Sequence, residues 1–146
     1  LSVATLLRQL LVVSANDAAL ALAQHVGGGS VDRFVELMNE KAHQLGLDHT
    51  TFENPHGLDE AGHASSAEDV TMLLRYALGI PFVRDTLDRT SLVVPNGDEL
   101  PTTDDLLESW PPLVGGKTGH TGDAGWSEVA AARRGGHPLQ CIMESA

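Results

Sequence analysis

Two short stretches of the sequence combine residue types that could bind and process a peptide ending in a carboxylate. One reads Ser14-Ala15-Asn16, and the other reads Lys117-Thr118-Gly119 within GGKTGHTGDAGW. If Lys117 lies on an edge strand beside a cleft, its ammonium would attract that carboxylate, and the Thr118 hydroxyl would donate a hydrogen bond to it. Gly119 would leave room for a substrate backbone against the strand.

Ser14 and Asn16 also have a purely structural interpretation. Both precede an apolar stretch that is predicted to be helical, and their side-chain oxygens could accept hydrogen bonds from the free amides of its first turn. A lysine on a strand can likewise be only a solubilising surface charge. Each tripeptide is therefore weak evidence by itself, and the elements that position the two must be considered.

The first half of the chain is predicted to be helical. Apolar residues recur at helical spacing on both sides of residues 14–17, which predicts two helices. Ser30 is predicted to cap a third helix, and residues 65–68 read as a capping box for a fourth. Between the last two, residues 47–64 lack a regular period and are rich in Asn, Pro, Gly and His, which predicts a long surface loop.

The second half is predicted to form β structure. Residues 90–94 are mostly β-branched, and Asn96-Gly97 is a hairpin turn signal. Residues 104–107 fit a single helical turn, because the prolines that follow prevent its continuation. Three further strands are predicted at residues 113–121, 126–132 and 139–143. Helices followed by an antiparallel sheet indicate an α+β fold.

Composition argues against several classes of function. The formal net charge of −11 opposes binding to nucleic acid or to anionic lipid, because both would be repelled. No apolar run approaches the roughly 20 residues of a membrane-spanning helix. His49, His56 and His63 fall in the long loop without the spacing of a metal site, so we expect neither a metal nor another cofactor. We expect His56 to bond to loop backbone.

The two tripeptides are two of the three signatures of the penicillin-recognising serine enzymes, and they occur in the right order. Residues 34–78 (FVELMNEKAHQLGLDHTTFENPHGLDEAGHASSAEDVTMLLRYAL) and 114–126 (VGGKTGHTGDAGW) resemble the D-alanyl-D-alanine carboxypeptidases, the low-molecular-mass penicillin-binding proteins of peptidase family S11. The resemblance covers nearly the whole chain. It implies part of the fold shared with serine β-lactamases, a helical cluster packed on an antiparallel sheet, without its N-terminal portion. Within a partial domain over 1–146, residues 1–80 would be helical and 81–146 mainly sheet.

The resemblance also implies a role for each residue of the two motifs. Ser14 would pass a proton toward the leaving amine, and Asn16 would orient the substrate carbonyl. The backbone N–H of His120 would be one donor of the oxyanion hole. The implied catalytic residues are Ser14, Asn16 and Lys117, and the implied substrate-binding residues are Thr118, Gly119 and His120.

The third signature, Ser-x-x-Lys, carries the nucleophile in this family and does not occur in the sequence. Lys41 and Lys117 are the only lysines, and the residues three places earlier are Met38 and Val114. We therefore expect a fragment that is inactive alone, with the nucleophile on a missing N-terminal segment or on a second chain. A noncatalytic peptide-binding or scaffold relative, or a serine β-lactamase, remains an alternative.

The resemblance finally implies a biological setting. The expected substrate is a peptidoglycan stem peptide ending in D-Ala-D-Ala, cleaved through an acyl-enzyme, and β-lactam antibiotics are expected ligands. The expected location is extracytoplasmic in bacteria, in cell-wall synthesis and cell shape. One departure concerns residues 101–107, where Asp104-Asp105 stands in a segment that is usually rich in asparagine in the family.

Overall fold

The computed structural model describes residues 1–133 and 135 and the backbone of residues 140–145. The helices are α1 (Val3–Val13), α2 (Asn16–Val26), α3 (Val31–Gln44), α4 (Ala67–Ala77), α5 (Pro81–Leu87) and α6 (Leu106–Ser109). The strands are β1 (Ser91–Val93), β2 (Glu99–Pro101), β3 (Leu113–Thr121), β4 (Gly125–Ala132) and β5 (Gln140–Ser145). This order confirms the α+β prediction.

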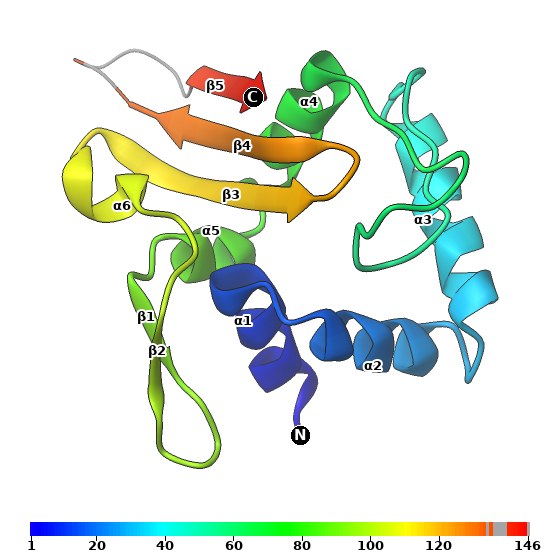
Figure 1. Ribbon diagram of the computed structural model, residues 1–146, viewed down its shortest axis with the longest axis horizontal. Coiled ribbons are helices and arrows are strands. Elements are labelled where there is room, and N and C mark those ends of the chain that lie inside the picture. The colour runs from blue at the N-terminus through cyan, green and yellow to red at the C-terminus, as the bar shows by residue number, and fades with distance from the viewer. Residues whose placement is uncertain (134, 136–139, 146) are drawn as a thin grey trace.

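The described strands form two antiparallel sheets. β1 and β2 make a hairpin, and β3, β4 and β5 make a three-stranded sheet in that order, so β3 lies at an edge among the strands described. Figure 1 shows α5 directly below β3 and α1 below α5 in this view, with α4 next to β4 and β5 and α3 at the right. The edge strand therefore packs on α5, and its Lys117 reaches Ser14 at the junction of α1 and α2.

Helices α4 and α5 pack against the sheet through a small apolar core, made of Leu74, Leu78, Leu87, Val129 and Ala131. Gly115 has a φ of +144°, and a Cβ at this position would lie 3.1 Å from the Leu87 Cβ. Glycine thus allows α5 to approach the start of β3 closely. Truncating a buried leucine of such a core to alanine typically costs about 2–5 kcal/mol.

The helix caps agree with the sequence in one case and differ in another. Ser30 caps α3 as predicted, since its hydroxyl accepts a hydrogen bond from the Arg33 amide at 3.1 Å. The cap of α4 is Ser66, which accepts from the Asp69 amide at 3.1 Å. The capping box predicted from Ser65 is therefore wrong by one residue, because the Ser65 hydroxyl bonds to Thr50 instead.

Helix α5 was not predicted. Pro81 occupies its first position, where a fixed φ and a missing N–H do no harm, so the sequence did contain a start signal. The hairpin, α6 and the strand over 113–121 are confirmed, and β4 begins one residue earlier than predicted, at Gly125. The last strand is present as β5, while Leu139, its predicted first residue, lies outside the described residues.

The long loop between α3 and α4 is held by hydrogen bonds to the side chains of Asn39 and Asp69. The Asn39 amide group donates to the Phe52 carbonyl and accepts from the Phe52 amide, both at 2.8 Å. The buried Asp69 carboxylate accepts from the His49 amide at 2.9 Å and from the Thr50 hydroxyl at 2.7 Å.

Among the helices that the structure describes, none combines the length and the apolar character that a membrane span requires.

Candidate active site

Lys117 of β3 and Ser14, at the junction of α1 and α2, meet in space. The Lys117 Nζ donates to the Ser14 Oγ at 3.0 Å and to the backbone carbonyl of Thr118 at 2.7 Å. The ammonium is half-buried, and the Ser14 hydroxyl is exposed. The structure thus brings the two sequence motifs together across one groove.

Ser14 has an unusual backbone conformation that turns the chain from α1 into α2. Its φ is +57° and its ψ is +40°, in the left-handed region, and it forms the C-cap of α1. Among the described residues, it is the one residue other than glycine with a positive φ. A non-glycine residue in this region costs about 1–2 kcal/mol, which the surrounding contacts must offset.

The structural interpretation of Ser14 and Asn16 as caps of α2 is wrong. The N-cap of α2 is Ala15, which has no side chain to bond the first turn, and Asn16 is already the first helical residue. The free amide of Ala18 is satisfied by the Asp17 carboxylate at 2.8 Å. Ser14 and Asn16 both line the groove, and neither side chain caps α2.

The groove is a cavity of about 770 Å³ whose lining includes all six residues that the sequence indicated. They are Ser14, Asn16, Lys117, Thr118, Gly119 and His120. Residues of the long loop, including His56 and Asp59, form another wall. One edge strand, one helix junction and one loop therefore enclose the groove.

Thr103 was not recognised from the sequence, although it joins the two sides of the groove. Its amide donates to the Val12 carbonyl at the end of α1, at 3.1 Å. The Thr118 hydroxyl bonds both the carbonyl and the hydroxyl of Thr103, at 3.1 and 3.0 Å. This bridge ties α1 to β3 and fixes the separation of the two motifs. No local pattern marked Thr103, because its partners are distant in sequence.

The charge of Lys117 is set by two opposing effects. Burial lowers the pKa of its ammonium, and the negative charge of Asp104 raises that pKa again. Asp104 is only 3% exposed, and burial raises the pKa of its carboxyl group. The protonation of Lys117 therefore depends on its burial and on the charge of Asp104.

The loop wall of the groove is fastened to the turn between β3 and β4. The Asp59 carboxylate accepts a hydrogen bond from the Asp123 amide at 3.2 Å. A hydrogen bond from the Thr121 hydroxyl, with the nearby amides, lowers the pKa of Asp59. His56 accepts from the Leu58 amide at 3.3 Å, which confirms its expected bond to loop backbone.

Two aromatic side chains line the groove side by side. The rings of His120 and Trp126 lie side by side with centroids 4.4 Å apart. Within the described residues, no group of three or more His, Cys, Asp or Glu side chains could hold a metal ion.

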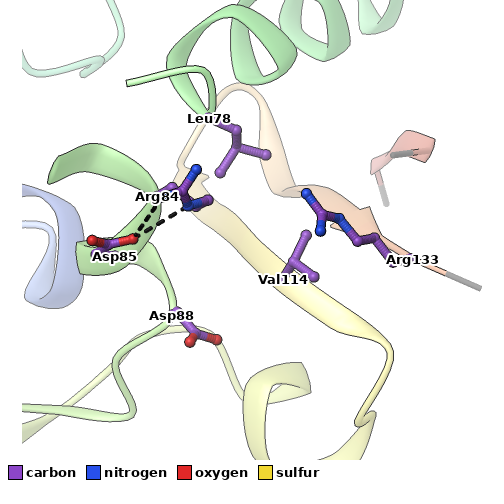
Figure 2. Close-up of a pocket in the computed structure, with 6 residues that line it drawn as sticks. All are labelled: Leu78, Arg84, Asp85, Asp88, Val114 and Arg133. Atoms are coloured by element: carbon purple, nitrogen blue, oxygen red, sulfur yellow. Dashed lines mark hydrogen bonds and ion pairs between the residues drawn. The ribbon is translucent and has the colours of Figure 1, made fainter. Parts of the chain in front are cut away.

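A second, smaller cavity of about 300 Å³ lies at the opposite end of β3. Figure 2 shows Arg84 and Arg133 on either side of Leu78 and Val114, with Asp85 next to Arg84. Arg84 and Asp85 form an ion pair of 3.2 Å. This cavity contains none of the motif residues and is separate from the groove at Lys117.

The sequence matches the family described as D-alanyl-D-alanine carboxypeptidase, peptidase S11, over residues 1–145. D-alanyl-D-alanine carboxypeptidase DacB2 of Mycobacterium tuberculosis is 41% identical over 143 residues, which cover 94% of this chain and 48% of that protein. The chain thus spans about half the length of this relative.

Solved structures agree with the family match. A D-alanyl-D-alanine carboxypeptidase of Mycobacterium tuberculosis superposes with a TM-score of 0.89 at 38% identity, over 100% of this chain and 57% of that one. Penicillin-binding protein D2 of Listeria monocytogenes, solved in an ampicillin-bound form, gives 0.84 at 34% identity, over 97% and 58%. The fold, the groove and these matches together show that the chain belongs to the D-alanyl-D-alanine carboxypeptidases of peptidase family S11.

Proposed function

We propose that the protein is a serine-type D-alanyl-D-alanine carboxypeptidase that acts on peptidoglycan stem peptides. The observation that carries the proposal is the hydrogen bond between Lys117 and Ser14 across a groove large enough for a peptide end. A cation and a hydroxyl at one end of a groove suit a substrate that ends in a free carboxylate and must receive a proton during cleavage.

Each motif residue has a defined task in this proposal. Lys117 attracts the terminal carboxylate, and the Thr118 hydroxyl exchanges its bond to Thr103 for one to the substrate. Ser14 passes a proton toward the leaving amine, and Asn16 orients the substrate carbonyl. The backbone N–H of His120 stabilises the oxyanion, a contribution that typically accelerates such reactions about 10²–10³-fold.

The nucleophile lies outside this sequence, which contains no Ser-x-x-Lys. We place it on a further segment of the same polypeptide, or on a second chain. The match covers only 48% of DacB2, which supports a further segment. The serine attacks the penultimate D-alanine carbonyl, the peptide bond breaks, and the D-alanine leaves with the transferred proton. Water then hydrolyses the acyl-enzyme and regenerates the serine.

The same groove would accept β-lactam antibiotics, which also carry a carboxylate beside a reactive carbonyl. The ampicillin-bound form of the Listeria monocytogenes relative supports this ligand class. We further propose an extracytoplasmic location in bacteria, since the substrate belongs to the cell wall. The 146-residue chain alone would not be acylated.

The decisive experiment measures D-alanine release from an acylated peptide ending in D-Ala-D-Ala, together with the mass of the protein after incubation with benzylpenicillin. The full-length protein should release D-alanine and gain the mass of one penicillin. Peptide binding without either reaction would indicate a noncatalytic peptide-binding relative. Rapid penicillin turnover without a lasting adduct would indicate a β-lactamase instead.

A further inference from the structure

Asp104 is a buried acidic group to which the proposed mechanism gives no task. It is 3% exposed, and its Oδ1 accepts a hydrogen bond from the Leu106 amide at 3.0 Å. Its Oδ2 is buried and has no hydrogen-bond partner among the described residues. An unpaired carboxylate oxygen away from water is costly, and a positive charge nearby would offset part of that cost.

The position of Asp104 relative to β3 points to that partner. A Cβ on Gly116 would lie 2.6 Å from the Asp104 Oδ2, so the carboxylate rests directly against the backbone of the residue before Lys117. The preceding residue, Thr103, is bonded to Thr118, the residue after the lysine. The segment that carries Asp104 is therefore held along the strand on both sides of Lys117.

We propose that Asp104 is a positioning residue for the reaction, acting as the buried counter-charge that keeps Lys117 an ammonium. The ammonium makes its hydrogen bonds to Ser14 and to the Thr118 carbonyl, so Asp104 acts through its field and not through direct contact. In a partly buried site such a field is weakly screened. The pKa of Lys117, which burial lowers and Asp104 raises, agrees with this role.

Other titratable groups near the pair must be considered in any pH experiment. Asp105 follows Asp104 in the chain, and its negative charge opposes the ionisation of Asp104 by raising its pKa. The groove is also lined by His120 of β3 and by His56, Asp59 and His63 of the loop. The pH dependence is therefore measured in the alkaline range, where a lysine ammonium ordinarily loses its proton.

The proposal rests on the proposed function, and the test separates the two. In the full-length protein, Asp104→Asn removes the negative charge. It keeps the shape of the side chain and the oxygen that accepts from the Leu106 amide. The alkaline decline in the rate of acylation by benzylpenicillin should begin at lower pH in Asp104→Asn than in the wild type. Above that midpoint the rate should fall about tenfold per pH unit. The exposed Asp98→Asn, with the same loss of charge, should keep the wild-type profile.

An alkaline decline that Asp104→Asn leaves in place would overturn the proposal, while the function would stand. If the wild-type protein is not acylated at all, the proposed function fails. The effect of Asp104 on the Lys117 pKa can then still be measured by NMR of the lysine side chains. The Lys117 signal, identified by its loss in Lys117→Arg, should titrate at lower pH in Asp104→Asn.

The wild-type protein gives a further test that does not depend on the variant being folded. The Lys117 signal should show a second, acidic inflection at the pH where the Asp104 carboxyl carbon titrates. A Lys117 signal insensitive to that titration would overturn the proposal.

Discussion

The Lys117 Nζ lies 3.0 Å from the Ser14 Oγ, although 103 positions separate the two residues in the chain. The contact places an ammonium and a hydroxyl at the junction of an edge strand and a helix turn. It is also the feature on which the proposed chemistry depends, because substrate attraction and proton transfer both pass through it. The consequences of this contact can be measured in the full-length protein.

Lys117→Ala should reduce acylation by both a D-Ala-D-Ala peptide and benzylpenicillin by about a hundredfold or more, because carboxylate attraction and proton transfer are lost together. Rates of adduct formation measured by mass spectrometry would check this. Lys41→Ala is the matched control, since Lys41 bonds to Gln44 on an exposed helix face and lies outside the groove. Equal rates in the two variants would contradict the role of Lys117.

Asn16→Ala should lower turnover without a loss of stability, because Asn16 does not cap α2. Ser2→Ala should do the opposite. The Ser2 hydroxyl accepts from the Thr5 amide at the start of α1, so its removal should cost about 1 kcal/mol with normal turnover. Thermal unfolding and D-alanine release together distinguish the two. An unfolding effect of Asn16→Ala with normal turnover would restore the capping interpretation.

Gly116→Ala should destabilise the protein by about 1–3 kcal/mol, because the added Cβ would lie 2.6 Å from the Asp104 Oδ2 and 3.0 Å from the Val129 carbonyl oxygen. Combining it with Asp104→Ala should recover part of the loss, which a double-mutant cycle from denaturant unfolding would measure. Strictly additive losses would show that the carboxylate does not pack against residue 116.

Asp69→Asn should destabilise the loop that forms one wall of the groove. The Thr50 hydroxyl and the His49 amide lower the pKa of Asp69 in the folded state. The resulting stability is present above the unfolded pKa and is lost as the pH falls through the folded pKa. The difference in Tm between wild type and variant should therefore be large near pH 7 and shrink in acid.

The neighbouring Glu68→Gln is the control for Asp69→Asn. Glu68 is exposed on the first turn of α4, and its carboxylate makes none of the bonds that hold the loop. Its Tm should follow wild type across the same pH range. A Tm difference for Asp69→Asn that is the same at pH 7 and in acid would show that charge at this position does not anchor the loop.

The local elements of the fold were largely predictable from the sequence. Helical apolar spacing, the Ser30 cap and the Asn96-Gly97 turn are short-range signals, and the structure confirms each of them. Helix α5 was missed because it is short and contains Val and Thr, which also suit strands. Pro81 at its start was the available signal.

The geometry of the site was less predictable, because it depends on contacts between distant segments. The left-handed conformation of Ser14 follows no local rule for serine, and it forms between α1 and α2, in contact with Lys117 of β3. Thr103 and Asp104 gain their importance from their positions beside Thr118 and Gly116. The sequence motifs thus identified the chemical groups of the site. The residues that hold these groups in place could be identified only from the three-dimensional structure.

The most direct measurement is a crystal structure of the full-length protein with a bound penicillin or a peptide ending in D-Ala-D-Ala. We expect the ligand carboxylate within hydrogen-bonding distance of the Lys117 Nζ and the Thr118 Oγ1, with Ser14 beside the reacting bond. A carboxylate bound elsewhere, such as between Arg84 and Arg133 in the second cavity, would contradict the proposed site (Figure 2).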